Sequence, residues 1–327
     1  MNKKIIISFL TAGVLLLSAC SKNTDIFVPD AGQLNGPDTT WQVTVTSTMP
    51  VSSLKTSLLI EPYLDSIEVN ANTATLNTPL GVQVIFPPNS CVTAAGAPIS
   101  GKIQVELLAL KKKGDMVRMS KPTTTYDSLL VTAGEIFVRL KKDGLPVQLA
   151  PNARIYIKYA DLPINTGMKL FFGDESNPQQ FNWLPNQDLV NNVIGMGTQG
   201  YEISTNHLRW INIAYGFNTA STPTVQVVAD LAPYFTNANT VAFTVLKDFR
   251  SLAGMHGDLS TKKFISPRLP VGKAITVVVI SKQANDYYLG YESAVTLTPT
   301  NGTVNQVVSV RPVKKSLPEI IAYLSTL

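Results

Sequence analysis

The side chains that most often act as nucleophiles, general bases or metal ligands are sparse in this chain, which has 327 residues but only two His and two Cys. His207 and His256 lie far apart in the sequence, and no spacing to a Ser or an Asp indicates a catalytic triad. The G-x-S-x-G and H-E-x-x-H signatures of hydrolases do not occur. We therefore expect a protein that is not an enzyme and has no catalytic residues. A hydrolase that uses His207 or His256 in an unrecognised site is the alternative.

Two further patterns could bind a ligand. Gly195-Met-Gly197-Thr-Gln-Gly200 has the G-x-G-x-x-G spacing of a dinucleotide site, but an alternating strand pattern follows where that site needs a helix. Asp174, Glu175 and Asn177 could offer oxygen ligands to Ca²⁺, although they lack the dense carboxylate spacing of a dedicated loop. Both patterns are more typical of turns between strands, so the sequence predicts no metal and no cofactor.

The amino-terminal residues carry the clearest signal. Lys3 and Lys4 precede a short apolar run over 5–17, which leads into Leu17-Ser18-Ala19-Cys20. This order is typical of a secretory signal peptide, here 1–19, and the run is too short to span a membrane as a stable helix. Leu17-Ser18-Ala19-Cys20 resembles the lipobox of bacterial lipoproteins. The resemblance implies cleavage before Cys20, acylation of its sulfur and amino group, and stable anchoring in a membrane.

Residues 20–40 follow the cleavage point and contain Pro, Gly, Asn and Asp without apolar periodicity. Such a composition predicts a tether between the lipidated Cys20 and the folded part. Ser21 stands where an Asp would resemble the inner-membrane retention signal of enteric bacteria, which favours the outer membrane. Lys22 and Asp25 only weakly resemble the surface-export signal of Bacteroidetes lipoproteins, so the choice between the periplasmic and the cell-surface face stays open.

Charge and cysteine content exclude further classes of protein. The formal net charge of +5 falls to +3 when Lys3 and Lys4 leave with the signal peptide, which is too small an excess to indicate a nucleic-acid partner. Lipidation of Cys20 leaves Cys91 without a disulfide partner. We expect Cys91 to be a small buried residue of an apolar strand, since free cysteines are among the most buried residues.

The body of the chain, between residues 41 and 315, alternates apolar and polar residues instead of following a helical period. The clearest alternating stretches are 41–46, 103–107, 136–140 and 155–159. Hairpin turns are expected at Lys113-Gly114-Asp115, Asp143-Gly144 and Asn301-Gly302. The last of these predicts a hairpin between 293–298 and 303–310. The sequence therefore predicts an all-β protein of tandem antiparallel β-sandwich modules.

One helix is expected, at the carboxyl terminus. Ser316-Leu-Pro318-Glu319 has the pattern of a capping box with Pro in the first turn. Leu317, Ile320, Ile321 and Leu324 follow at the spacing of one apolar stripe. A stripe of this kind normally packs on its own domain, and a partner-binding helix is the alternative.

A family resemblance supports this organisation. Leu76 to Asn89, with the turn Pro87-Pro88, followed by Gly96 and Ile99-Ser-Gly101-Lys-Ile103, resembles the ZU-type β-sandwich of ankyrins and netrin receptors. It covers roughly 70–160 and implies a sandwich over 41–160 and a small β module over 161–222 packed on it. Leu269 to Lys273 resembles a turn of transthyretin-like and Ig-like modules, which implies a sandwich with the terminal helix over 223–327. Together with the lipobox, the chain resembles outer-membrane lipoproteins of Bacteroidetes-type bacteria, and that resemblance implies no activity.

Three groups of residues are candidates for contact with a ligand or for modification. Tyr287, Tyr288 and Tyr291 form an aromatic run, with Tyr287 and Tyr291 on one face of a strand, that could stack on sugar rings. Lys111, Lys112 and Lys113 lie at an expected hairpin tip, where they are a solvated turn or a contact for anionic lipid or acidic glycan. Ser66, Ser128 and Thr39 occur in triplets that resemble the O-glycosylation signal of exported Bacteroidetes proteins.

The sequence thus favours an outer-membrane-anchored lipoprotein of non-catalytic binding or structural type. Its expected partners are the membrane, through Cys20, and a glycan or another envelope protein. A glycan-binding accessory protein of a nutrient-uptake system is one alternative. That alternative predicts an exposed aromatic platform, so burial of Trp183, Trp210, Tyr287 and Tyr291 would count against it. The hydrolase is the other alternative.

Overall fold

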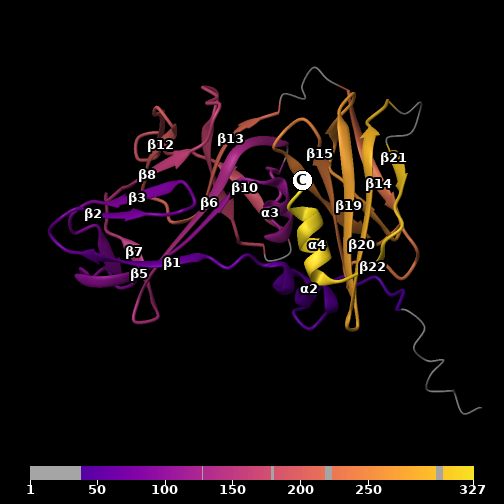
Figure 1. Cartoon of the computed structure of the whole chain (residues 1–327), viewed down its shortest axis with the longest axis horizontal. Helices are drawn as coiled ribbons and strands as arrows, with labels where there is room; N and C mark the ends of the chain where they lie inside the picture. The colour runs from indigo at the N-terminus through magenta and orange to yellow at the C-terminus, as the bar shows by residue number, and fades with distance from the viewer. Residues whose placement is uncertain (1–37, 127, 178–179, 218–222, 300–304) are drawn as a thin grey trace, which may run out of the picture. The chain divides into compact units, whose positions relative to one another are not determined.

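A computed structural model describes residues 38–126, 128–177, 180–217, 223–299 and 305–327. The described residues form three sheets whose strands are almost all antiparallel, together with three short helices, which confirms the all-β class (Figure 1). The expected signal peptide and most of the expected tether, with Cys20, lie outside the described residues.

The largest sheet of the amino-terminal half has eight strands. Its main path is ordered β1 (Tyr63–Val69), β5 (Gly101–Leu110), β6 (Leu130–Lys142), β13 (Arg209–Gly216), β9 (Lys169–Asp174) and β10 (Asn182–Pro185). β7 (Leu145–Leu149) pairs with β6 and with β4 (Cys91–Thr93). The two-residue turn from β6 to β7 is Asp143-Gly144, and both residues have positive φ, so the expected hairpin is confirmed there.

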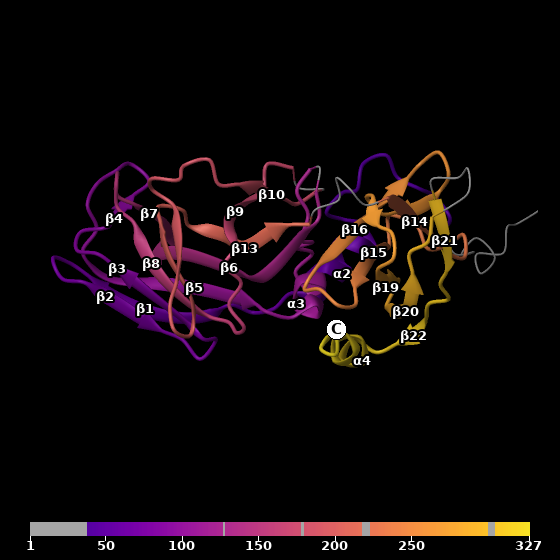
Figure 2. The ribbon, with the colours of Figure 1, turned by 90° about the horizontal axis from the view of Figure 1, so that it is seen from above.

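A second sheet of five strands packs on the first (Figure 2). Its order is β11 (Val193–Met196), β12 (Gly200–Thr205), β8 (Ile155–Ala160), β3 (Val82–Phe86) and β2 (Ala74–Asn77). Strands such as β8 alternate strictly between buried and exposed residues, because one face covers the core and the other faces solvent. The buried apolar residues on the facing sides of the two sheets form one core. We call these two sheets the first sandwich.

The first sandwich extends beyond residue 160. The segment 161–222 was expected to form a small module of its own, but its strands β9 to β13 lie in the same two sheets. β12 pairs with β8, and β13 pairs with β6. The physical reason is that β8 has an open edge after pairing with β3, and β12 fills it.

The third sheet has nine strands and makes up the second sandwich. Its order is β18 (Leu269–Pro270), β14 (Thr224–Asp230), β17 (Lys263–Ile265), β16 (Leu252–Asp258), β15 (Thr240–Leu246), β19 (Ala274–Gln283), β20 (Asp286–Thr296) and β22 (Val313–Lys315), with β21 (Asn305–Ser309) beside β14. Val227 of β14 and Val279 of β19 share one buried core although their strands are far apart in this order. The sheet therefore folds over on itself around that core.

The pairing of β21 differs from the sequence prediction. A hairpin was expected between 293–298 and 303–310, but β21 runs parallel to β14, while β20 pairs with β19 and β22. Val308 and Val310 reach the core of the second sandwich in this position. Burial of these residues against β14 explains the choice, and the expected turn at Asn301-Gly302 lies outside the described residues.

The helices give two further corrections. α2 (Pro50–Leu58) was not foreseen, and it buries Val51, Leu54 and Leu58. The expected turn at Lys113-Gly114-Asp115 is instead the start of helix α3 (Lys113–Arg118), because Met116 and Val117 become buried there. The terminal helix α4 (Leu317–Leu324) is confirmed, with the capping box between Ser316 and Glu319.

The alternating stretch 41–46 does not form a strand either. Trp41 packs on Phe264, with 5.1 Å between ring centroids, and Gln42 exchanges two hydrogen bonds with the side chain of Asn237. Side-chain contacts of this kind take the place of a strand ladder.

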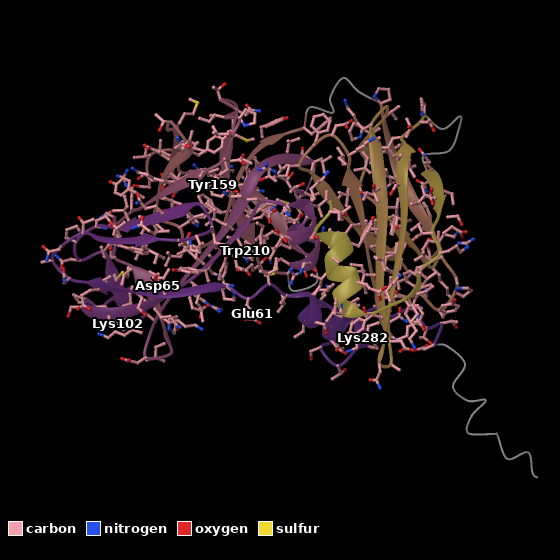
Figure 3. All side chains as sticks on the ribbon, viewed as in Figure 1. Glu61, Asp65, Lys102, Tyr159, Trp210 and Lys282 are labelled. Atoms are coloured by element: carbon pink, nitrogen blue, oxygen red, sulfur yellow. The ribbon has the colours of Figure 1, made fainter. Side chains whose placement is uncertain are left out.

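A second apolar cluster joins the two sandwiches. We call it the junction cluster. Its buried members come from the outer face of the eight-stranded sheet, from all three helices, and from β15, β16, β19 and β20. Trp183 and Trp210 are among its buried members, with 6.5 Å between their ring centroids; Trp210 is labelled in Figure 3. Ile320 and Leu324 of α4 belong to it as well, so the apolar stripe of this helix packs within the chain, as the sequence predicted.

Candidate functional site

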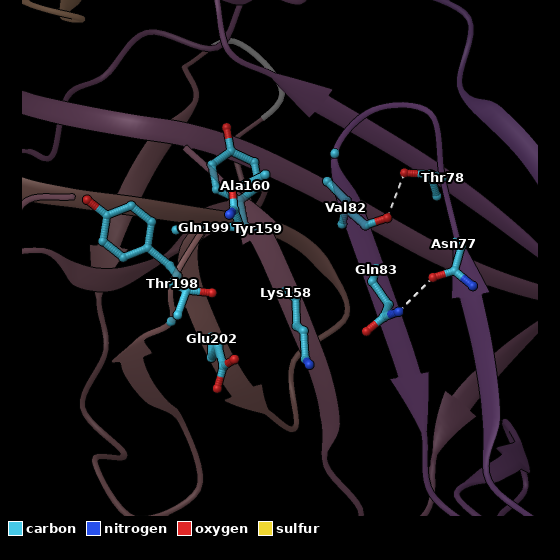
Figure 4. Close-up of a pocket in the computed structure, with 14 residues that line it drawn as sticks. Asn77, Thr78, Val82, Gln83, Lys158, Tyr159, Ala160, Thr198, Gln199 and Glu202 are labelled. Carbon is cyan, nitrogen blue, oxygen red and sulfur yellow. Dashed lines mark hydrogen bonds between the residues drawn. The ribbon is translucent and has the colours of Figure 1, made fainter. Parts of the chain in front are cut away.

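A groove lies on the solvent-facing side of the five-stranded sheet (Figure 4). Four polar side chains cross it in one row, because Asn77, Gln83, Lys158 and Glu202 are successive cross-strand partners on β2, β3, β8 and β12. The buried residues between them, such as Val82 and Tyr159, point to the opposite face. The groove is open to solvent along its length and has a volume of about 450 Å³.

Glycines form one end of the groove. The spacing Gly195-x-Gly197-x-x-Gly200 is the tight connection of the β11–β12 hairpin, where the amide of Gly197 donates to the carbonyl of Gly200 over 2.9 Å. A Cβ at Gly200 would stand 2.1 Å from the carbonyl oxygen of Tyr159, so the hairpin can approach β8 only without a side chain here. The preference for a turn over a dinucleotide site is therefore confirmed.

Several polar groups of the groove are available to a ligand. The Gln83 amide donates to Asn77 Oδ1 over 2.6 Å, and Thr78 Oγ1 donates to the Val82 carbonyl over 2.7 Å. Within the described residues, no hydrogen bond engages Asn77 Nδ2 or Gln83 Oε1. Lys158 and Glu202 are exposed neighbours on adjacent strands, yet no ion pair joins them or ties either one to another described residue.

An aromatic side chain stands beside the polar row. Tyr156 lies two residues before Lys158 on β8 and on the same face, and 48% of it is exposed. Its cross-strand partners are Ile85 on β3 and Ser204 on β12. Among the described aromatic residues, none stacks on Tyr156. About half of this side chain is thus exposed, two residues along β8 from the groove residue Lys158.

The two histidines do not contribute to this groove. His207 is exposed but stacks on Phe172, with 3.8 Å between ring centroids, and this partial desolvation lowers its pKa. His256 is exposed on β16 of the second sandwich. The hydrolase alternative requires an imidazole that is hydrogen-bonded to a carboxylate or a hydroxyl. Within the part of the chain that the structure describes, neither imidazole has such a bond.

The acidic loop after β9 has structural partners. Tyr126 donates to Asp174 over 2.6 Å. Hydrogen bonds from Ser176 and from Tyr126 together lower the pKa of Asp174. Glu175 forms an ion pair with Arg209 over 2.5 Å. The described residues contain no group of three or more His, Cys, Asp or Glu placed to hold a metal ion.

The tyrosine run is largely engaged in packing. Tyr287 is hydrogen-bonded to Ser57 over 3.0 Å, and Tyr291 stacks on Tyr323 of α4 with 4.2 Å between ring centroids. Tyr288 lies on the other face against Phe235, as strand alternation predicted. Tyr291 remains half exposed.

The tryptophans bear on the glycan-binding alternative. Trp183 is 0% and Trp210 5% exposed, so neither belongs to a solvent-facing platform. With Tyr287 bonded to α2 and Tyr291 stacked on α4, the region favoured from the sequence offers less open aromatic surface than that alternative needs.

The three lysines are not at a hairpin tip. Their ammonium groups donate to carbonyls in three other parts of the chain: Lys111 to Ala160 over 2.6 Å, Lys112 to Ser325 over 3.5 Å, and Lys113 to Leu246 over 2.6 Å. Desolvation lowers the pKa of Lys111 and of Lys113. Local sequence suggests a solvated basic patch, whereas the fold uses these lysines to connect α3 with β8, α4 and β15.

The remaining candidates are placed as follows. Ser66, Ser128 and Thr39 are exposed, and their glycosylation stays a prediction. Cys91 is a free cysteine with 1% exposure, and burial raises the pKa of its thiol, which confirms it as a core residue. Cys20 lies outside the described residues.

The comparisons with known proteins add no family assignment: no protein-family model matches the chain, and no curated protein matches it at the similarity required. Of the helices that the structure describes, none combines the length and apolar character needed to cross a membrane.

The groove residues were not foreseen from the sequence. The one available signal was the polar outer face of each alternating strand, which does not tell which strands become neighbours.

Proposed function

We propose that this chain is a lipoprotein anchored in the outer membrane through Cys20, and that its first sandwich binds a ligand without catalysing a reaction. The observation that carries the binding function is the row formed by Asn77, Gln83, Lys158 and Glu202. These side chains line one groove and offer donors and acceptors of both kinds that are not engaged by another described residue, so a ligand there would replace only water.

The anchoring part rests on the lipobox-like sequence before Cys20 and on the tether after it. A tether of this kind separates the membrane from the folded part, which begins near Thr39.

Metabolic labelling tests the anchor. The full chain expressed in a Gram-negative host should incorporate radiolabelled palmitate and sediment with the outer membrane, whereas Cys20→Ala should do neither. Cys91→Ala is the matched control, since it removes the other cysteine and should keep the label. Equal labelling of the parent and Cys20→Ala would refute the anchor.

The groove chemistry favours binding over hydrolysis. Its carboxylate, ammonium, amide and hydroxyl groups donate and accept hydrogen bonds, and both histidines lie elsewhere in the fold. A screen of the detergent-solubilised full chain against sugars, amino acids and short peptides tests the binding function. A ligand that is lost in the double variant Lys158→Ala/Glu202→Ala supports it. Failure of every compound to bind, or equal binding by the double variant, would contradict it.

A further inference from the structure

The charge balance of the groove disfavours ligands with a net charge. Lys158 and Glu202 contribute one positive and one negative charge side by side, and the other polar side chains, such as Asn77, Gln83 and Thr198, are neutral amides and hydroxyls. An anionic group attracted to the Lys158 ammonium is repelled by the Glu202 carboxylate beside it, and a cationic group attracted to Glu202 is repelled by Lys158. A neutral ligand that both donates and accepts hydrogen bonds meets neither repulsion.

Hydroxyl groups of a ligand fit the donors and acceptors of the polar row. A carboxylate such as Glu202 only accepts hydrogen bonds and an ammonium such as Lys158 only donates them, while a ligand hydroxyl can do both. Asn77 Nδ2 and Gln83 Oε1 add a donor and an acceptor in the same row. In Figure 4, Gln83, Lys158 and Glu202 extend to the same side of the sheet. Adjacent hydroxyls of one ligand can therefore bind to neighbouring side chains at once.

The aromatic ring next to the row fits the carbon face of a sugar. Tyr156 lies two residues from Lys158 on the same face, so the rise along a strand places the two positions about 7 Å apart. Its exposed ring can bury the apolar face of a pyranose while its hydroxyl stays in water. Ile85 beside it adds apolar surface. A polar row with one exposed aromatic ring beside it matches a ligand longer than one ring.

From these features we propose that the groove binds a short, uncharged oligosaccharide, with one unit hydrogen-bonded to Gln83, Lys158 and Glu202 and the next stacked on Tyr156. This inference rests on the proposed binding function and specifies its ligand. It differs in place from the tyrosine run at Tyr287–Tyr291, which belongs to the second sandwich.

A glycan array with neutral, acidic and basic oligosaccharides, probed with the detergent-solubilised full chain, tests the ligand class. Titration calorimetry with the best neutral glycan then tests the place. Tyr156→Ala and Glu202→Gln should each weaken the affinity about tenfold or more, which corresponds to the loss of one well-formed contact. Tyr291→Ala is the matched control, since it removes the half-exposed tyrosine of the second sandwich and should leave the affinity unchanged.

The outcomes separate this inference from the proposed function. Binding of neutral glycans that is weakened by Tyr156→Ala and not by Tyr291→Ala supports the inference. Binding weakened by Tyr291→Ala alone overturns the site. Exclusive binding of charged glycans, or binding of an amino acid or peptide that Lys158→Ala abolishes, overturns the ligand class and leaves the binding function standing. No binding of any compound overturns both. Circular dichroism of each variant verifies that these exposed substitutions leave the fold intact.

Discussion

Replacing Glu135 by glutamine should change how the stability of this protein depends on pH. Glu135 lies on β6 and is 0% exposed, and its cross-strand partners are Asn212 on β13 and Leu110 on β5. Within the described residues, neither carboxylate oxygen of Glu135 nor Nδ2 of Asn212 has a hydrogen-bond partner. A buried and unpaired carboxylate is costly in its charged form.

Desolvation is the main influence on the pKa of Glu135 and raises it well above the ordinary value, against an opposing effect of Lys121. The Lys121 ammonium lies 3.7 Å from the ring centroid of Phe181, and burial lowers its pKa to about 8. The carboxyl group is therefore protonated in the folded state over a pH range in which the unfolded chain has already released this proton.

The sign of the effect follows from proton linkage. Since the pKa of the folded state is raised, the associated stability is fully present below the unfolded pKa near 4.5 and is lost as pH rises toward the folded value. The free energy of unfolding should fall by about 1.4 kcal/mol for each pH unit in that window. Glu135→Gln keeps the shape and stays neutral, so its advantage should be small near pH 4.5 and grow to about 3 kcal/mol or less at pH 7.

Urea denaturation at pH 5, 6, 7 and 8, followed by fluorescence of the buried tryptophans, measures this difference. Glu106→Gln is the matched control, because Glu106 is also on the eight-stranded sheet but pairs with Lys141 and Arg139. Desolvation opposes ionisation there, yet the hydrogen bonds from Lys141 and Arg139 outweigh it and lower the pKa. Glu106→Gln should therefore destabilise the protein at pH 7, and less so in acid. A difference in stability between Glu135→Gln and the parent that is the same at every pH would refute the reasoning.

Three further substitutions test elements of the fold. Gly200→Ala should lower the free energy of unfolding, measured by urea denaturation, by about 2 kcal/mol or more, because the new Cβ would stand 2.1 Å from a carbonyl oxygen of β8. A Cβ at Gly216 would meet open space, so Gly216→Ala should lower it by less than half as much. Ser316→Ala should lower the free energy of unfolding by about 1 kcal/mol through loss of the capping box, and no change in thermal unfolding would contradict that role. Lys113→Ala should lower the free energy of unfolding by about 1–2 kcal/mol, because two carbonyls at the end of β15 lose their donor. Lys112 donates over 3.5 Å, so Lys112→Ala should change it little. Equal effects of the two substitutions would contradict this role of Lys113.

Features that depend on neighbouring residues alone were predictable. The capping box at Ser316 and the two-residue turn at Asp143-Gly144 are set by side chains and backbone conformations within a few positions, and both occur as expected. The alternation of strand residues such as Ile155 to Ala160 likewise gives the buried and exposed faces correctly. Burial of Cys91 follows from the same pattern.

Features that depend on distant partners were not predictable. Lys113-Gly114-Asp115 has the composition of a turn but begins helix α3. A Cβ at Gly114 would stand 1.7 Å from the Leu324 carbonyl, so this helix packs closely on the end of α4, which is remote in the sequence. Residues 305–309 had a plausible hairpin partner nearby and pair in parallel with β14 instead. In both places the choice is made by burial against an element that is remote in the sequence.

The groove shows the same division. Alternation with period two along each strand is enough to place Gln83, Lys158 and Glu202 on the side away from the core. That these three strands are neighbours, and that their polar side chains form one row beside Tyr156, depends on the folding of the whole sandwich. Alternation specifies a face but no partner, and the partner is chosen by how the apolar faces of all strands fill a common core.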